Sequence, residues 1–200
     1  MTAVPVPPAE LLSIEDYVAL GEIEHGRYEL MEGRLLVSPS PAPTHMIAVY
    51  ELCARVKEQL PRSLRVVPDV DLDLEFARPG EPGWSRRPDL LVVTEDGLAR
   101  ANREDGLLRA SEVVVVAEVV SPGSERTDFV TKRAEYAAAG IPQYWIADLR
   151  SPVSLMPCRL DGDSGGYQDP GGHTGPFTTM VADHQGNRFP VRLDPRDLLD

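Results

Sequence analysis

The stretch from Val113 to Val120 constrains the fold more than any other part of this 200-residue chain. Its sequence, VVVVAEVV, is apolar except for Glu118. A continuous apolar run of this kind is typical of a strand that is buried on both faces. A carboxylate inside such a strand is costly unless a cation or hydrogen-bond donors receive it. Glu118 is therefore a candidate functional residue.

The residues after this run predict a βαβ unit. Residues 121–124 (SPGS) break the strand, a helix is expected from about Glu125 to Ala139, and Gly140 is a common C-terminal cap. Residues 143–148 are rich in aromatic and β-branched side chains and predict a second strand. Two strands joined by a helix in this way are normally parallel and right-handed.

The predicted helix carries Asp128, Lys132 and Tyr136 four residues apart, and hence on one face. One interpretation is a surface ion pair beside a packed tyrosine. However, of the 20 basic residues only Lys57 and Lys132 are lysines. In a chain that prefers arginine so strongly, a lysine here favours a site that needs a compact ammonium group rather than a planar guanidinium.

We expect a single domain over residues 13–200, preceded by a flexible lead-in over residues 1–12, with no internal repeat. The Pro-rich N-terminus lacks the basic region of a signal peptide, and no stretch approaches the length of a membrane span. The expected location is cytoplasmic. Cys53 and Cys158 form no metal or redox motif, so both are interpreted as ordinary thiols.

Hydrophobic patterning and turn signals predict the remaining elements. They are helices over 14–22, 44–60 and 194–199, strands over 27–31, 34–37, 64–76, 90–93 and 152–160, and a polar excursion over 95–111.

The helix over 44–60 has an apolar stripe that we expect to face the core. The stripe consists of Met46, Val49, Tyr50, Cys53, Val56 and Leu60. At the start of this helix stands His45, which either caps the helix or is solvated, or else points into a functional site.

The net charge of −12 argues against tight non-specific binding to nucleic acid, because neutralisation of phosphates supplies most of that affinity. A local basic strip would still permit binding to DNA or RNA. Arg86 and Arg87 precede Asp89, and Arg126 and Arg133 flank the predicted helix of the βαβ unit.

Asp89 begins one apolar strand, and Glu118 lies near the end of another. If these strands are neighbours in the sheet, the two carboxylates come together. Hard oxygen ligands of this kind, completed by water and a substrate phosphate, suit Mg²⁺ or Mn²⁺. Lys132 would add positive charge for a phosphoryl transition state. Glu29, inside the strand over 27–31, either faces solvent or supplies a third carboxylate.

Taken together, these motifs resemble the Uma-two family, whose members are restriction-endonuclease-like proteins of the PD-(D/E)XK nuclease superfamily. The resemblance covers residue 13 to the C-terminus. It rests on the segments YEL (28–30), EG (32–33), SPSP (38–41), RPDL (87–90), EVVSP (118–122), GIP (140–142) and YW (144–145), together with His45, Asp128, Lys132, Tyr136 and Asp148. It implies an α/β (mixed α+β) fold with a mixed β-sheet flanked by helices.

The resemblance also implies roles for particular residues. Asp89 matches the aspartate of the superfamily motif, Glu118 matches its second acid, and Glu29 matches an acid contributed by the early hairpin. The lysine expected two residues after Glu118 is absent, because Val120 stands there. Lys132 resembles the migrated lysine of related families. Gln143 stands where relatives often carry glutamate and is given no role.

The leading hypothesis is a Mg²⁺-dependent (or Mn²⁺-dependent) endonuclease that hydrolyses phosphodiester bonds of nucleic acid, with DNA the expected substrate. Its metal ligands would be Asp89, Glu118 and Glu29, and Lys132 would complete the catalytic set. A homodimer is plausible by analogy, since two-fold symmetry serves cleavage of a duplex. One alternative is a catalytically inactive nuclease fold kept as a binding or assembly module. Another is a small phosphoryl substrate such as a nucleotide.

Overall fold

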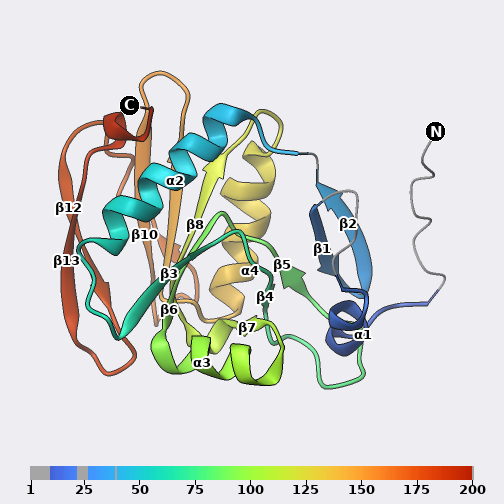
Figure 1. Cartoon of the computed structure of the whole chain (residues 1–200). Coiled ribbons are helices and arrows are strands. Elements are labelled where there is room, and N and C mark those ends of the chain that lie inside the picture. Colours follow the sequence, from blue (N-terminus) through green and yellow to red (C-terminus); the bar gives the residue numbers. More distant parts are fainter. Residues whose placement is uncertain (1–9, 22–26, 39, 200) are drawn as a thin grey trace.

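The computed structural model describes residues 10–21, 27–38 and 40–199, and its centre is a six-stranded sheet (Figure 1). The strand order is β11-β10-β9-β8-β6-β3. The strands are β3 (Leu64–Pro68), β6 (Leu90–Thr94), β8 (Val113–Val120), β9 (Gln143–Asp148), β10 (Ser154–Leu160) and β11 (Tyr167–Gln168). Because β8 is central, all eight of its residues are buried, as its apolar sequence predicts.

The predicted βαβ unit is confirmed: β8 and β9 pair in parallel, and a helical segment connects them. This connection is not a uniform α-helix. A π-helical segment, η2 (Thr127–Lys132), leads into α4 (Arg133–Ala138). On the other side of β8, strand β6 pairs antiparallel, with Leu90 opposite Ala117. Asp89 therefore enters the sheet beside the end of β8 that carries Glu118.

A second sheet has the order β2-β1-β5-β4-β7. Its strands are β1 (Arg27–Met31), β2 (Arg34–Ser38), β4 (Leu72–Asp73), β5 (Ser85–Arg86) and β7 (Leu108–Arg109). The predicted β1–β2 hairpin is confirmed, and its turn holds Glu32 and Gly33 at φ 50° and 72°. Glycine is required at position 33, because a Cβ there would lie 2.9 Å from the Leu12 carbonyl oxygen.

The helix α1 (Ile14–Ala19) precedes this hairpin and begins after its N-cap, Ser13, whose side chain accepts the amide of Asp16. It ends at Ala19, short of the predicted end, and position 22 lies outside the described residues. Most of the predicted lead-in, residues 1–9, also lies outside them. Its last residue, Leu12, is buried, and its amide donates to the Gly33 carbonyl.

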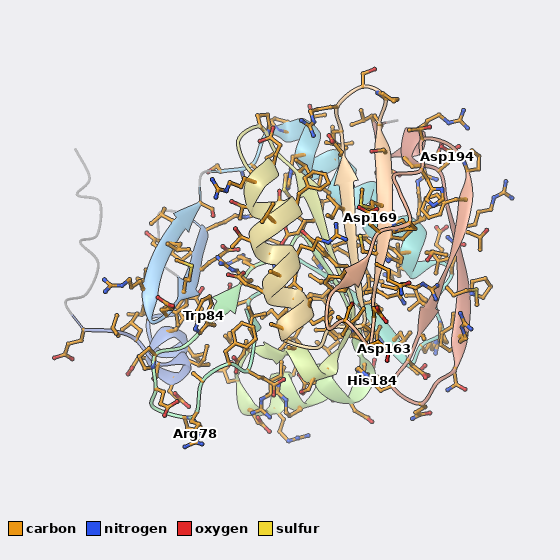
Figure 2. The ribbon with its side chains drawn as sticks, turned by 180° about the vertical axis from the view of Figure 1, so that it is seen from behind. Arg78, Trp84, Asp163, Asp169, His184 and Asp194 are labelled. Carbon is orange, nitrogen blue, oxygen red and sulfur yellow. The ribbon has the colours of Figure 1, made fainter. Side chains whose placement is uncertain are left out.

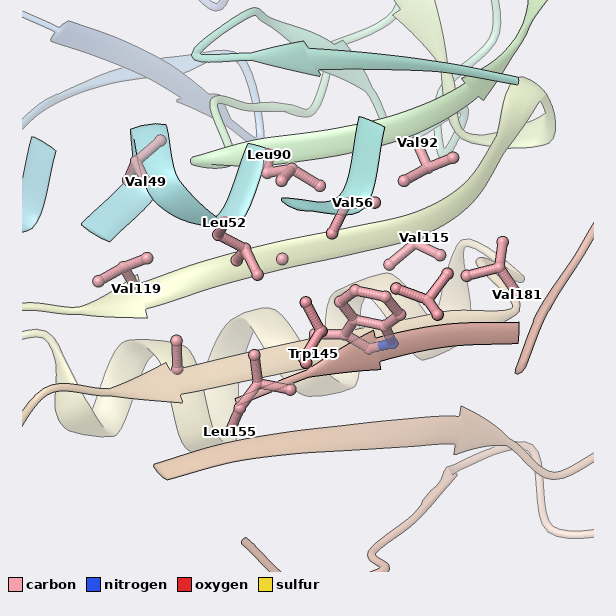
Figure 3. Packing of buried hydrophobic residues seen from close by; sticks show 14 of the residues in the cluster. Val49, Leu52, Val56, Leu90, Val92, Val115, Val119, Trp145, Leu155 and Val181 are labelled. Carbon is pink, nitrogen blue, oxygen red and sulfur yellow. The ribbon is translucent and has the colours of Figure 1, made fainter. Parts of the chain in front are cut away.

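Helices cover both faces of the central sheet. On one face, α2 (Pro43–Lys57) packs Val49, Leu52 and Val56 against β8 and β9 around Trp145 (Figure 3). On the other face, α4 lies in front of the sheet in the view of Figure 2 and contributes Tyr136 to a second core cluster with Tyr144. The arrangement is a mixed sheet flanked by helices, which confirms the predicted fold class.

The stripe predicted for α2 is wrong in part. Met46 and Tyr50 are exposed, and the buried face instead carries His45, Ala48, Val49, Leu52 and Val56. Apolar residues occur on both sides of this helix, so spacing alone does not identify the core face. The buried face of α2 is shifted by one residue position from the predicted face. It includes His45, which is hydrogen-bonded to Asp89.

Two further predictions need correction, and one hairpin was not predicted. The polar excursion over 95–111 contains the helix α3 (Glu95–Glu104), strand β7 and a 3-10 turn, η1 (Ala110–Glu112). The single strand predicted over 64–76 is divided between β3 and β4, with Asp69 in between at φ 53°. A hairpin of β12 (Phe177–Ala182) and β13 (Arg188–Leu193) was not predicted at all.

The predicted terminal helix is confirmed as the 3-10 segment η3 (Pro195–Leu199). Within the described ranges, none of the helices combines the length and the apolarity that a membrane crossing requires.

Candidate active site

One cavity of about 480 Å³ lies where the β1 hairpin, the start of α2, the end of β8 and the π-helical segment meet. All five sequence candidates, Glu29, His45, Asp89, Glu118 and Lys132, line it. The same five side chains are buried, the most exposed being Lys132 at 8%. The cavity therefore gathers these polar side chains from five separate parts of the chain.

Glu118 is the innermost carboxylate of this cluster. Its Oε1 accepts hydrogen bonds from Lys132 Nζ and from the Tyr136 hydroxyl, each at 2.8 Å. Both donors come from the helical segment that covers this face of the sheet, as the shared helix face predicts. The hydrogen bonds to Glu118 within the described chain all fall on Oε1, which leaves Oε2 for another ligand.

Charge in this pocket is unbalanced toward the acids. Burial raises the pKa of Glu118 to about 8, because desolvation and the neighbouring Asp89 and Asp128 outweigh the attraction of Lys132. Burial opposes the charge of Lys132, yet Glu118, Glu29 and Asp128 together raise its pKa. Lys132 therefore stays protonated. Its single positive charge does not neutralise all the carboxylates around it.

Asp89 is held from two directions. Its Oδ2 accepts the amide of Val119 at 2.8 Å, which ties the start of β6 to the end of β8. Its Oδ1 lies 2.9 Å from His45 Nε2 and 3.9 Å from a guanidinium nitrogen of Arg27. Each carboxylate oxygen has two lone pairs, so these contacts leave Asp89 able to accept a metal ion as well.

Glu29 reaches the same pocket from β1, but both of its oxygens are already engaged. Oε2 accepts Arg86 Nη1 at 2.9 Å, while Oε1 accepts the Arg87 amide at 3.1 Å and lies 3.4 Å from Lys132 Nζ. Burial works against ionisation, but Lys132 and Arg86 lower the pKa of Glu29 overall. Arg86 also forms a bidentate pair with Glu135 at 2.6 and 2.7 Å.

Asp128 stands on the π-helical segment, 4.0 Å from Lys132. Its carboxylate accepts the Ser124 hydroxyl, and its backbone carbonyl accepts the Tyr144 hydroxyl at 2.8 Å. Burial raises the pKa of Asp128. The Asp128 carboxylate is thus engaged by Ser124 and lies near Lys132.

The donor chemistry of the cavity fits a divalent cation held partly by water. The described residues contain no group of three or more acidic, histidine or cysteine side chains arranged to hold a metal. Asp89 and Glu118 nevertheless offer two hard oxygen donors in a pocket with excess negative charge. Mg²⁺ commonly uses one or two carboxylates and keeps several waters, so two such ligands are sufficient.

Two arginines complete the lining, and sequence reasoning did not assign them. Arg27 and Arg87 both pair with Asp69, at 2.5 and 2.9 Å. Each cation of the cavity among the described residues therefore already has a carboxylate partner. A basic groove free of acids, which would favour strong binding to a nucleic-acid backbone, does not lead to Asp89 in this part of the chain.

Sequence reasoning gave Ser121 no role in the site and named Arg86 only in a possible basic strip. Ser121 lines the cavity and contacts His45, and the SPGS break directly after the strand of Glu118 was the signal that could have found it. Arg86 is 2% exposed, and its place two residues before the strand-leading Pro88-Asp89 pair was the corresponding signal. Gln143 lies outside the cavity and donates to the Met180 carbonyl, consistent with the absence of a role.

Comparisons with known proteins agree with this architecture. A search of curated proteins finds no match. Among solved structures, the chain is similar to a "putative nuclease belonging to DUF820" from Anabaena variabilis, with 16% sequence identity and a TM-score of 0.64 over 94% of this chain and 97% of that one. At this identity the likeness shows the fold alone. The model of the family Uma2, described as "Putative restriction endonuclease", matches residues 14–187, and the chain therefore belongs to the Uma2 family.

Proposed function

We propose that this protein is a metal-dependent endonuclease that hydrolyses phosphodiester bonds of nucleic acid, with Mg²⁺ or Mn²⁺ as its cofactor. The observation that carries the proposal is the shared cavity of Asp89, Glu118 and Lys132, in which buried carboxylates exceed the cations that neutralise them. The family description and the printed name of the Anabaena variabilis protein support the same activity.

In this proposal Asp89 and Glu118 hold the cation. Asp89 is fixed by the Val119 amide and His45, and the Oε2 atom of Glu118 is open to a ligand. A bound divalent cation would supply Lewis acidity toward the scissile phosphate and the attacking water. The side chains would hold that cation in place and line a pocket that admits a phosphate group.

Lys132 supplies fixed positive charge to the phosphoryl oxygens, on which negative charge develops in the transition state. Its ammonium has three donors, and Glu118 and Glu29 orient it at 2.8 and 3.4 Å. Glu29 is proposed as the third carboxylate of the site. Because Arg86 and the Arg87 amide already engage it, its contacts favour a role in holding Lys132 over direct ligation of the metal.

The substrate proposed is DNA, with a homodimer as the form that would cut both strands of a duplex. The paired state of Arg27 and Arg87, together with the net charge of −12, favours binding that depends on the divalent cation rather than on free basic residues.

A second candidate function is a nuclease fold that binds or assembles without cleaving. The Glu29–Arg86–Glu135 network favours it, because carboxylates held by arginine in a closed network serve structure. This network reaches Glu118 only through Lys132, and Arg27 approaches Asp89 only to 3.9 Å, which is why cleavage remains the preferred proposal.

The test is a cleavage assay on single-stranded DNA, double-stranded DNA and RNA with Mn²⁺, Mg²⁺ or a chelator. The samples are the wild type, Asp89→Asn, Glu118→Gln and the control Asp194→Asn, whose acid pairs with Arg196 outside the cavity. We expect cation-dependent cleavage by the wild type and the control, and its loss in both site variants. Cation binding without cleavage of any of the three substrates would favour the binding module.

A further inference from the structure

Three side chains from separate parts of the chain form a row that ends on Asp89. The Ser121 hydroxyl lies 3.0 Å from His45 Nδ1, and His45 Nε2 lies 2.9 Å from Asp89 Oδ1. Ser121 follows β8, His45 stands in the first turn of α2, and Asp89 precedes β6. All three line the cavity of about 480 Å³.

The direction of the hydrogen bonds in this row follows from the chemistry of its ends. An ionised Asp89 can only accept, so Nε2 of His45 carries the proton and donates it. In the neutral imidazole the other nitrogen, Nδ1, is then an acceptor, and the Ser121 hydroxyl donates to it. Asp89 thereby selects the tautomer of His45, and the Ser121 hydroxyl, which can donate or accept, pairs with the remaining nitrogen.

The surroundings of His45 favour an indirect role. His45 is 7% exposed, and both of its ring nitrogens are engaged within the protein. It lies on the buried face of α2, next to Ala48 and Val49, so its backbone is anchored by the core. With neither nitrogen free, His45 acts on the site through Asp89 rather than on a substrate.

We propose that His45 and Ser121 are positioning residues that hold Asp89 in the orientation required to bind the divalent cation, an inference that rests on the proposed function. Hydrogen-bond partners of a ligating carboxylate orient it, and their removal typically lowers metal affinity about 10–100-fold. Ser121 holds the Nδ1 side of the His45 ring, His45 donates to Oδ1 of Asp89, and the Val119 amide fixes Oδ2.

The test compares three replacements of His45 by calorimetric titration with Mn²⁺. The amide nitrogen of glutamine falls near the place of Nε2, whereas that of asparagine falls near Nδ1 and does not reach Asp89. We expect His45→Gln to keep the affinity for Mn²⁺ within about 3-fold of wild type, and His45→Asn and His45→Ala to lower it about 10–100-fold. His184→Gln, on the exposed turn between β12 and β13 (Figure 2), is the control and should change nothing.

Ser121→Ala is expected to weaken Mn²⁺ binding in the same direction, but less than His45→Ala. Cleavage kinetics at saturating Mn²⁺ give a second readout. If His45 acts by positioning Asp89, saturation should restore kcat of His45→Ala to within about 10-fold of wild type.

The outcomes separate the two proposals. A wild type that binds no Mn²⁺ overturns both the proposed function and this inference. A wild type that binds and cleaves, with all three His45 variants within 3-fold of it, overturns the positioning role alone. The same conclusion follows if His45→Gln is as weak as His45→Ala, because the donor at Nε2 would then not be what matters.

Discussion

The ammonium of Lys132 lies 2.8 Å from Oε1 of Glu118, although 14 residues separate them in the chain. The resemblance to the PD-(D/E)XK pattern implies a lysine at position 120, but Val120 is buried there. Alternation along β8 puts positions 118 and 120 on the same face of the sheet, the face that the η2–α4 helix covers. Lys132, on this helix, is therefore able to supply the positive charge that Val120 of the strand does not.

The first prediction concerns Lys132→Met. It removes the charge that would act on the phosphoryl oxygens, and we expect cleavage to fall about 100–1,000-fold with Mn²⁺ binding retained. The matched control is Lys57→Met, which replaces the other lysine of the chain, on the exposed side of α2. Cleavage within 10-fold of wild type would contradict the assigned role of Lys132.

A lysine returned to β8 should compensate in part. In the Lys132→Met background, Val120→Lys places an ammonium on the face that carries Glu118, and we expect cleavage to recover at least about 10-fold. Single-turnover cleavage at saturating Mn²⁺ measures the effect. Folding of the double variant is checked by circular dichroism, and a folded double variant with no recovery would show that the approach from the helix is itself required.

Arg86 is predicted to be the main structural cation beneath the site. Arg86→Met leaves the buried carboxylate of Glu29 and the half-buried carboxylate of Glu135 without their shared partner, and we expect a loss of about 3–5 kcal/mol in the free energy of unfolding. Arg150→Met breaks an exposed pair with Asp148 and should cost less than about 1 kcal/mol. Urea denaturation measures both, and equal losses would argue against the network.

The raised pKa of Glu118 predicts how stability changes with pH in the absence of metal. Its folded pKa of about 8 exceeds the value of 4.5 for an exposed glutamate. Folding therefore favours the protonated form of Glu118. The contribution of this group to the free energy of unfolding is fully present below about pH 4.5 and is lost as pH rises through 8. The Glu118→Gln variant has no ionisable group at this position and therefore lacks this pH dependence of stability.

Unfolding free energies of wild type and Glu118→Gln, measured with a chelator from pH 5 to 9, should therefore diverge. We expect the wild type to lose stability relative to the variant as pH rises. Binding of a divalent cation to ionised Glu118 should in turn release a proton near neutral pH and strengthen with pH. A difference between the two proteins that does not depend on pH would contradict the assignment.

Much of the site could be predicted from the sequence because local sequence patterns mark its residues. The apolar run around Glu118 predicts a central strand, the four-residue spacing predicts that Lys132 and Tyr136 share a face, and Pro88-Asp89 marks the start of the neighbouring strand. The pairing of β6 with β8 then brings the carboxylates to one cavity.

What the sequence does not reveal depends on tertiary contacts. His45 is buried on the core face of α2 with both ring nitrogens hydrogen-bonded to Asp89 and Ser121, and these partners come from distant parts of the chain. In α3, apolar residues are too few to give a periodic pattern, although the Thr94 cap followed by Glu95 and Asp96 is a start signal that could have identified it. The partners of Arg86 come from β1 and α4, which no local pattern connects.

The central claim is that Asp89 and Glu118 together hold a divalent cation, and calorimetric titration with Mn²⁺ tests it most directly. We predict one specific site in the wild type and in Asp194→Asn, with binding lost in both Asp89→Asn and Glu118→Gln. These two isosteric changes remove a negative charge and preserve shape, so a folded variant reports on ligation. Binding that survives in either site variant at wild-type affinity, or its absence in the wild type at millimolar Mn²⁺, would contradict the account.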